Sequence, residues 1–385
     1  MTSSADLFDC FAVVAPGLEP LALAEGQRLG LNAVAEDGGF GWRGDTNSIL
    51  RANVGLRIAS RVLVRLATFD ARSFAELERH ARRVPWARIV KAGDTVRFRV
   101  TCKKSKLYHS DAVAQRFADA LTRTVPGVHA QGGSIGEDDA TDDDSALLIV
   151  VRFMRDHCTV SADSSGALLH RRGYRQATAK APLRETLAAA LIAASEWDGA
   201  SPLVDPLCGS GTIPIEAALI AHGFPPGARR TFAMERWPNV GKKQGDLMRA
   251  ERDNGERNNS AVRIIGSDRD AGAIAAAQSN AARAGVSAEL ELAVRSISAA
   301  QFPGAERGWV VTNPPYGVRV GDSDQVRDLW AQLGKVLREG AAGWRVAVLS
   351  PEARLERQLG VTLKVVATTR NGGIPVRLLV GDVPK

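Results

Sequence analysis

Cysteine and histidine are scarce in this sequence, and neither forms a recognisable metal motif. The 385 residues contain six histidines and four cysteines, none of them in a Cys-x-x-Cys pair: Cys10, Cys102, Cys158 and Cys208. Because no cysteine–histidine cluster has the spacing of a zinc site, we expect no metal and no disulfide framework.

Long hydrophobic runs are also missing. The longest strongly apolar runs are residues 146–151 and 187–194, whereas a helix that spans a bilayer needs roughly 20 apolar residues. The first residues show no basic stretch followed by an apolar one, so no secretory signal is evident. We therefore expect a reduced, cytoplasmic protein without a membrane partner.

What the sequence does contain is enough apolar residues for a core and a surplus of positive charge. Hydrophobic residues make up 45% of the chain, and its length predicts about two to three domains. Lysine and arginine outnumber aspartate and glutamate by 50 to 43, a net charge of +7. This surplus indicates a polyanionic partner, most simply nucleic acid, although many basic proteins have none. The acidic run at residues 137–144 is interpreted as a solvated loop.

The front of the chain alternates short strands and helices, which predicts a small α+β region followed by a second one. We expect strands at residues 11–14, 95–101, 146–152 and 157–163, and helices at residues 19–29 and 110–122. From about Arg184 the pattern changes to strands separated by helices, ending in an antiparallel pair at residues 363–368 and 376–380. This alternation predicts βαβ units and a parallel sheet, with a polar insertion at residues 224–259.

A glycine-rich turn connects the first of these strands to a helix. Leu203 and Val204 lead into Asp205-Pro206-Leu207-Cys208-Gly209-Ser210-Gly211-Thr212, and an apolar helix follows at residues 213–221. Such a turn lets the backbone approach a ligand, with helix N–H groups facing it. The Gly-x-Gly pair alone is weak evidence, since an ordinary tight turn is the alternative and the dinucleotide fingerprint is incomplete.

Two aspartates follow the next predicted strand. Asp268 is placed to accept hydrogen bonds from ribose hydroxyls, and Asp270 is placed to cap the helix at residues 271–284. The opposite division of these two roles is the alternative.

The segment Asn313-Pro314-Pro315-Tyr316 ends another predicted strand. The two prolines stiffen the turn and remove two backbone donors. The Asn313 side-chain oxygen and the Pro314 carbonyl then form a pair of acceptors for the two hydrogens of an exocyclic amine. Tyr316 offers an aromatic face for a base taken out of its stack. A plain Asn-Pro turn is the alternative interpretation.

These motifs resemble those of a known family. Residues 205–212 and 313–316 are similar to the cofactor and catalytic motifs of class I S-adenosylmethionine-dependent amino methyltransferases. The whole chain resembles RNA guanine-N2 methyltransferases, in particular the N-terminal half of bifunctional enzymes that act on guanine N2 and N7 of 23S ribosomal RNA. The stretches that carry this wider resemblance are residues 17–19, 39–45, 104–110, 169–175 and 181–190.

The resemblance implies an α/β fold, with a Rossmann-like methyltransferase domain at residues 169–385 preceded by an α+β region. That region comprises a ferredoxin-like domain at residues 1–66 and a THUMP RNA-binding domain at residues 67–168. The implied cofactor is S-adenosyl-L-methionine, with Asp268 at its ribose and Ser296 where the family usually has an acid for adenine. The other residues implied to bind the cofactor are Asp205, Pro206, Cys208, Gly209, Ser210, Gly211, Thr212 and Asn313. Of these, Asn313 is also implied in catalysis.

The catalytic residues implied are Asn313, Pro314, Pro315 and Tyr316, and no guanine-N7 activity is assigned to these residues. The predicted partner is RNA, 23S ribosomal RNA before tRNA, and no metal is expected. Phosphate contacts are predicted for two basic clusters, for which a solvated surface is an equal alternative: Lys103, Lys104, Lys106, Arg171, Arg172 and Arg175. A tRNA guanine-N2 enzyme, an adenine-N6 DNA methylase and a noncatalytic RNA-binding assembly factor are the competing functions.

Overall fold

The computed structural model describes residues 7–135, 146–176, 183–238, 240, 262–304, 307–316 and 323–385. The acidic run at residues 137–144 lies outside the described residues. The chain divides into two compact units, each of which takes in separate stretches of the sequence. The first unit consists of Met1–Val13, Gly26–Leu169 and Arg230–Asp253, and the second of Val14–Glu25, His170–Arg229 and Asn254–Lys385.

The first unit is built on one eight-stranded sheet with the order β2-β3-β1-β4-β8-β7-β5-β6. Its strands are β1 (Phe8–Val13), β2 (Val34–Glu36), β3 (Gly39–Gly44), β4 (Arg61–Asp70), β5 (Thr95–Lys103), β6 (His129–Ser134), β7 (Ala146–Met154) and β8 (His157–Asp163). Its helices are α2 (Thr46–Gly55), α3 (Phe74–Ala81) and α4 (Ser110–Thr124), while α1 (Glu19–Arg28) begins in the second unit and ends in the first. The predicted α+β character is confirmed, and β2, β3, β4, β6, α2 and α3 are additions to the predicted elements.

Strand β4 joins the two predicted front regions. Residues 61–65 of β4 pair with β1, and residues 63–70 pair with β8. The sheet is therefore continuous across the boundary that the sequence places between residues 66 and 67.

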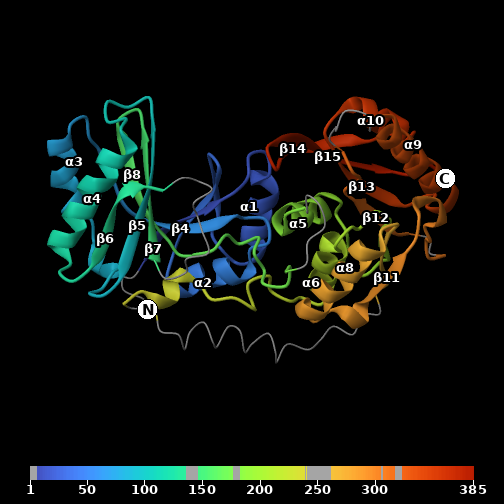
Figure 1. The fold of residues 1–385 in the computed structure, drawn as a ribbon, viewed down its shortest axis with the longest axis horizontal. Helices are drawn as coiled ribbons and strands as arrows, with labels where there is room; N and C mark the ends of the chain where they lie inside the picture. Colours follow the sequence, from blue (N-terminus) through green and yellow to red (C-terminus); the bar gives the residue numbers. More distant parts are fainter. Residues whose placement is uncertain are drawn as a thin grey trace. The chain divides into compact units, whose positions relative to one another are not determined.

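The far end of this sheet is covered by helices α3 and α4, which lie together beside β5 and β6 (Figure 1). Alternate side chains of β5 are buried, as expected for a strand with one covered face. Phe98 from β5 packs against Phe117 of α4 with ring centroids 6.1 Å apart, and Trp86 meets Phe117 edge-on. These aromatic contacts form the core at this end of the unit.

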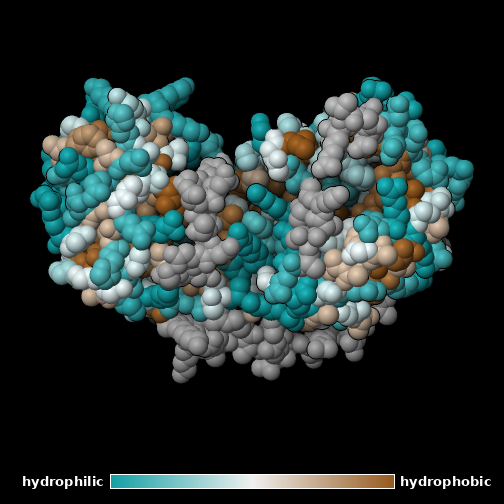
Figure 2. Space-filling model, in the orientation of Figure 1, coloured by the Kyte–Doolittle hydropathy of each residue, from teal (hydrophilic) through white to brown (hydrophobic). Residues whose placement is uncertain are grey.

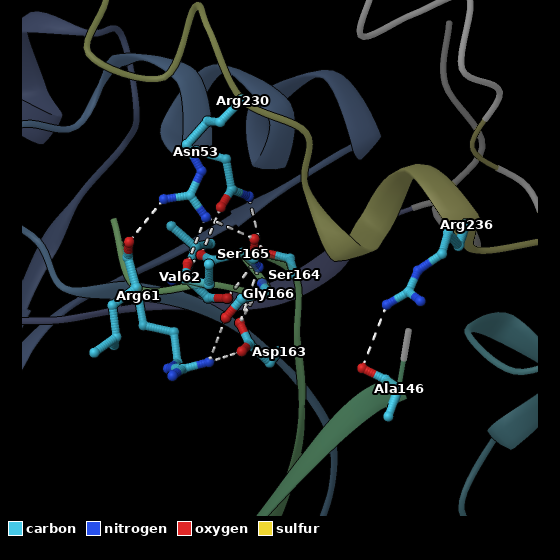
Figure 3. Close-up of polar contacts among 12 residues, drawn as sticks. Asn53, Arg61, Val62, Ala146, Asp163, Ser164, Ser165, Gly166, Arg230 and Arg236 are labelled. Atoms are coloured by element: carbon cyan, nitrogen blue, oxygen red, sulfur yellow. Dashed lines mark hydrogen bonds and ion pairs between the residues drawn. The ribbon is translucent and has the colours of Figure 1, made fainter. Parts of the chain in front are cut away.

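A buried polar network holds the chain after β8 in the same unit (Figure 3). Asn53 is fully buried; its amide donates to the Ser164 hydroxyl at 2.8 Å and accepts from the Ser165 hydroxyl at 2.6 Å. Arg61 forms an ion pair with Asp163. The Asn53 amide is thus satisfied by hydrogen bonds and the Asp163 carboxylate is balanced by the charge of Arg61.

Arg230 closes this network from a distant part of the sequence. Its guanidinium donates to the backbone carbonyls of Leu168, at 2.7 Å, Ser165 and Ala167 (Figure 3). The part of the predicted polar insertion that begins at Arg230 therefore belongs to the first unit, whereas residues 224–229, at the start of the insertion, belong to the second.

The second unit contains a seven-stranded sheet with the order β11-β10-β9-β12-β13-β15-β14. Its strands are β9 (Leu203–Asp205), β10 (Ile264–Asp268), β11 (Leu290–Val294), β12 (Trp309–Thr312), β13 (Arg345–Ser350), β14 (Lys364–Asn371) and β15 (Ile374–Asp382). The first five in this order are parallel, and β15 pairs antiparallel with both β13 and β14. This confirms the predicted parallel sheet closed by an antiparallel pair.

Helices cover both faces of the second sheet. They are α5 (Glu185–Ala194), α6 (Thr212–Ala221), α8 (Ala271–Ala284), α9 (Ser323–Gly340) and α10 (Ala353–Gln358). Helices α9 and α10 lie on the opposite side of the sheet from α5, α6 and α8 (Figure 1). All four residues of β12 are buried, as a central strand of a covered parallel sheet requires. The core beside α9 includes Trp330 and Trp344, which are 0% and 2% exposed.

Most of the described surface on the face in Figure 2 is hydrophilic, with separate hydrophobic patches. Exposed large apolar side chains include Val365 and Val366 of β14 and Ile374 of β15. Among the described residues, no helix is long and apolar enough to cross a membrane.

Candidate active site

The glycine turn between β9 and α6 has the backbone shape that the sequence predicts. Gly209 and Gly211 have φ angles of +52° and +83°, in the left-handed region that favours glycine. A Cβ atom at Gly211 would lie 2.9 Å from the Cβ of Ala277, so this position also needs glycine for close packing against α8. Among the described residues, no atom lies within 4 Å of a Cβ built at Gly209, which leaves this side of the turn open to a ligand.

The turn is fixed by hydrogen bonds from the neighbouring strand and helix. The Cys208 amide donates to the Ser267 carbonyl at 3.0 Å, and the Gly209 amide donates to the Asp268 carboxylate, also at 3.0 Å. From α8, the buried amide of Asn280 donates to the Ser210 carbonyl at 3.1 Å. The open backbone of the turn is therefore rigidly placed.

Asp268 and Asp270 have different partners. Asp270 caps α8, because its side chain accepts from the amides of Gly272 at 2.8 Å and Ala273 at 3.3 Å, as predicted. Asp268 is half-buried at the end of β10, and each of its two oxygens accepts one backbone N–H, from Gly209 and from Asp270. A carboxylate oxygen can accept more than one hydrogen bond, so Asp268 keeps acceptor capacity for a ligand.

Asp205 links the two motifs at the carboxyl edge of the sheet. It is 1% exposed, and its Oδ1 accepts from the Thr312 hydroxyl at 2.6 Å and from the Leu207 amide at 3.2 Å. Burial raises the pKa of Asp205 to about 7, an effect that the charge of Asp268 strengthens and these hydrogen bonds oppose. Asp205 thus joins the end of β9 to the end of β12, immediately before Asn313.

The Asn-Pro-Pro-Tyr turn follows β12 directly. The indole of Trp330 donates to the Pro315 carbonyl at 3.3 Å, and Asn371 donates to the Tyr316 hydroxyl at 2.6 Å. The Oδ1 atom of Asn313 is buried and has no hydrogen-bond partner within the described part of the chain. Pro314 is buried and Pro315 is exposed.

Both motifs line one cavity of about 800 Å³. The predicted site residues in its wall are Asp205, Cys208, Gly209, Ser210, Thr212, Asp268, Ser296, Asn313 and Pro315. Pro206, Gly211, Pro314 and Tyr316 are not part of this wall. The wall also includes Leu183, Ile297 and Leu329, which the sequence did not single out because isolated apolar residues carry no motif.

Two predicted residues have surroundings that limit their chemistry. Cys208 is 7% exposed, and burial raises the pKa of its thiol well above the usual value, so it remains protonated and is no nucleophile. Ser296 is exposed after β11, and its hydroxyl lies 2.9 Å from that of Ser298. Its hydroxyl can accept a hydrogen bond at the cavity wall.

The arginines between residues 171 and 175 differ from the predicted phosphate-binding cluster. Arg172 is 3% exposed, and its Nε lies 3.6 Å from Oε1 of Glu216. Arg175 donates to Glu185 at 2.9 Å and to the carbonyl of Leu183 at 2.8 Å. A guanidinium enclosed among protein carboxylates does not reach a phosphate, so Arg172 and Arg175 are corrected to structural residues. Arg171 is exposed.

The three lysines of the other predicted cluster lie at the surface. Lys103, Lys104 and Lys106 are exposed at the end of β5. The carbonyl of Lys103 accepts from the amide of Arg155 at 3.1 Å, which places these lysines beside the tight turn between β7 and β8. Tyr108, which is 67% exposed, stands nearby in the sequence.

The described residues contain no group of three or more histidine, cysteine, aspartate or glutamate side chains that could hold a metal ion. The cavity wall combines the open glycine turn, the half-buried carboxylate of Asp268 and the buried side-chain oxygen of Asn313. This oxygen receives no hydrogen bond from the described residues. This combination suits a ligand that brings hydroxyl and amine hydrogens.

Comparisons with known proteins identify related domains and sequences. The family model described as the RMKL-like methyltransferase domain matches residues 172–378, and the RlmL ferredoxin-like domain matches residues 9–63. A Synechocystis sp. protein provisionally named as an RNA methyltransferase is 33% identical over 96% of this chain and 95% of its own length. A ribosomal RNA large subunit methyltransferase K/L from Syntrophotalea carbinolica is 35% identical over 97% of this chain, which spans only 53% of that relative.

Solved structures share the whole architecture. A predicted N6-adenine-specific DNA methylase from Listeria monocytogenes has a TM-score of 0.86 at 32% identity, covering 97% of this chain and 96% of its own. A protein provisionally described as a methyltransferase and solved in complex with SAH has a TM-score of 0.86 at 28% identity, covering 99% of both chains.

Proposed function

Because this chain belongs to the family of RMKL-like methyltransferases, we propose that it methylates the exocyclic N2 amine of a guanine in RNA, with S-adenosyl-L-methionine as the methyl donor. The expected substrate is 23S ribosomal RNA before tRNA. The proposal rests on the Oδ1 atom of Asn313, which is buried without a donor among the described residues and belongs to a residue in the wall of the cavity. A buried acceptor without a partner costs free energy unless a ligand supplies the missing hydrogen.

The cavity residues fit S-adenosyl-L-methionine, which when bound supplies a methyl group on a positively charged sulfur. Gly209 leaves open space where a side chain would block a ligand. Asp268 accepts the ribose hydroxyls with the acceptor capacity that its two backbone donors leave, and Ser296 accepts from the adenine amine. Asp205 holds Thr312 next to these groups and so positions the following turn.

The Asn-Pro-Pro-Tyr turn holds the amine. Asn313 Oδ1 and the Pro314 carbonyl accept its two hydrogens, which leaves the nitrogen lone pair directed away from the protein acceptors. An amine conjugated to a base ring is a poor nucleophile, so orientation supplies much of the catalysis. Tyr316 stacks on the extracted base. The proton is lost after methyl transfer, so no strong base is needed.

The front of the chain, proposed as two domains at residues 1–66 and 67–168, binds the RNA, and the proposed domain at residues 169–385 carries out catalysis. Within the front of the chain, the ammonium groups of Lys103, Lys104 and Lys106 contact phosphates, which fixes the substrate without reading its sequence. The exposed ring of Tyr108 is available to stack on an unpaired base.

Adenine-N6 methylation is the second candidate, because one structural relative is described as a predicted adenine-specific DNA methylase. The same pair of acceptors holds either amine. The names of the ribosomal RNA relatives favour guanine in RNA.

Nucleoside mass spectrometry distinguishes these candidates. The purified protein is incubated with S-adenosyl-L-methionine and ribosomal RNA, tRNA or DNA from a deletion strain, and the nucleosides are analysed. We expect N2-methylguanosine in 23S ribosomal RNA. Methylation of tRNA alone would replace the RNA assignment, and N6-methyladenine would replace the base assignment.

Asn313→Ala tests the amine-holding role. We expect the methylation rate to fall by at least about 100-fold, because the substrate amine loses the acceptor that aligns it. The Kd for SAH should change by less than about twofold. Asn32→Ala, at an exposed position of the first unit, is the matched control. Methylation by Asn313→Ala at the wild-type rate would refute this role.

A further inference from the structure

The turn between β14 and β15 lies at the same edge of the second sheet as the candidate active site. Strand β13 runs parallel to β12, β15 runs antiparallel to β13, and β14 runs antiparallel to β15. Strand β14 therefore runs in the direction of β12, and the ends of both strands, at Asn371 and Thr312, point to one edge. In open α/β sheets this carboxyl edge is where ligands bind.

The turn itself has a defined shape. Asn371 pairs with Ile374 across a two-residue loop, and Gly372 and Gly373 have φ angles of +54° and +87°. Two positive φ angles are the signature of a type I′ turn, which continues the twist of the hairpin. The Arg370 guanidinium donates to the Gly373 carbonyl at 3.0 Å and braces the loop from one side.

From this braced turn one side chain reaches the Asn-Pro-Pro-Tyr motif. The Asn371 amide donates to the Tyr316 hydroxyl at 2.6 Å, although 55 positions separate the two residues in the sequence. Tyr316 is half-buried and packs against the apolar core that includes Trp330 and Trp344. Core packing fixes the body of the ring, and the hydrogen bond fixes its polar end.

We propose that Asn371 is a positioning residue for methylation: it holds the Tyr316 ring in the orientation on which the extracted base stacks. This inference rests on the proposed function of Tyr316. Asn371 is not part of the cavity wall, so in this proposal it acts through the Tyr316 hydroxyl. Loss of either partner should therefore have the same effect, and loss of both should cost no more than loss of one.

A double-mutant cycle tests this dependence. Methylation of 23S ribosomal RNA from a deletion strain is measured for wild type, Asn371→Ala, Tyr316→Phe and the double variant. We expect each single variant to lower kcat by roughly five- to tenfold, as the loss of one hydrogen bond predicts. The double variant should match the singles, because Tyr316→Phe keeps the ring and removes only the group that Asn371 holds.

Two further measurements separate positioning from folding. The Kd for SAH and the thermal unfolding midpoint should stay near wild type in all variants. Val366→Ala changes an exposed side chain earlier in β14 and is the matched control, expected to keep the wild-type rate.

Each outcome has a distinct meaning. Wild-type kcat in Asn371→Ala or in Tyr316→Phe, or reductions that multiply in the double variant, would overturn the inference. If the wild-type protein binds SAH but methylates no nucleic acid, the proposed function itself fails.

Discussion

The two basic clusters that the sequence singles out have opposite surroundings in the structure. In the first unit, Lys103, Lys104 and Lys106 are exposed at the end of β5, with their charges directed to solvent. In the second unit, Arg172 is buried beside Glu216, and Arg175 is paired with Glu185. The planar guanidinium can form several directed hydrogen bonds inside a protein, whereas the strongly hydrated ammonium of lysine favours the surface. Arg172 and Arg175 therefore hold the interior of their unit together, as Arg61 and Arg230 do in the first unit, whereas the lysine charges are available for a contact with a partner.

The strongest test of this contrast removes a buried arginine. Arg172→Ala leaves the enclosed carboxylate of Glu216 without that positive charge, and we expect the free energy of unfolding to fall by about 3–5 kcal/mol in urea denaturation. Arg171→Ala, at the exposed neighbouring position, is the control and should cost less than about 1 kcal/mol. An Arg172→Ala protein of normal stability that binds RNA poorly would restore the original prediction of a phosphate contact.

The second test uses pH. Burial raises the pKa of Glu185 from 4.5 to about 7, against the opposing charge of Arg175. The folded protein therefore keeps a proton that the unfolded chain has lost, so the stability from this group is complete below pH 4.5 and is lost as pH rises towards 7.

Because of Glu185, we expect the free energy of unfolding to fall by about 2–3 kcal/mol as the pH rises from 4.5 to about 7. Glu185→Gln should remove that part of the slope, whereas Asp205, whose pKa burial also raises to about 7, retains a slope of the same sign. An unchanged pH dependence in Glu185→Gln would contradict the assignment.

The mildest test removes the exposed lysines. Replacing Lys103, Lys104 and Lys106 by glutamine should lower RNA affinity by about tenfold at low salt and reduce the salt dependence of binding. The free energy of unfolding should change by less than about 0.5 kcal/mol. Lys91→Gln, at another exposed position of the first unit, is the control. Unaltered RNA binding in the triple variant would leave the first unit without its proposed contact surface.

Local patterns predicted the parts of the molecule that local chemistry determines. The glycine turn, the Asp270 cap and the alternation of strands and helices along the second unit follow from residues close together in the sequence. The two motifs then meet at one cavity because the carboxyl ends of parallel strands share an edge.

Pairings between distant residues could not be predicted in this way. Arg172 has the same sequence signal as a surface arginine, and only the fold brings Glu216 beside it. Asn371 precedes two glycines, a recognisable turn signal, but nothing in the sequence links it to Tyr316. The carbonyls that bind Arg230 lie more than 60 positions earlier.

Strand β4 has a practical consequence for anyone who divides this protein. Leu63, Val64 and Arg65 are hydrogen-bonded to β1 on one side and to β8 on the other. A truncation between residues 66 and 67 would cut through this strand and leave unpaired strand edges on both fragments, which promotes aggregation. Both predicted front regions should therefore be kept in one expression fragment. That fragment should also contain Arg230, whose guanidinium donates to the Leu168 carbonyl.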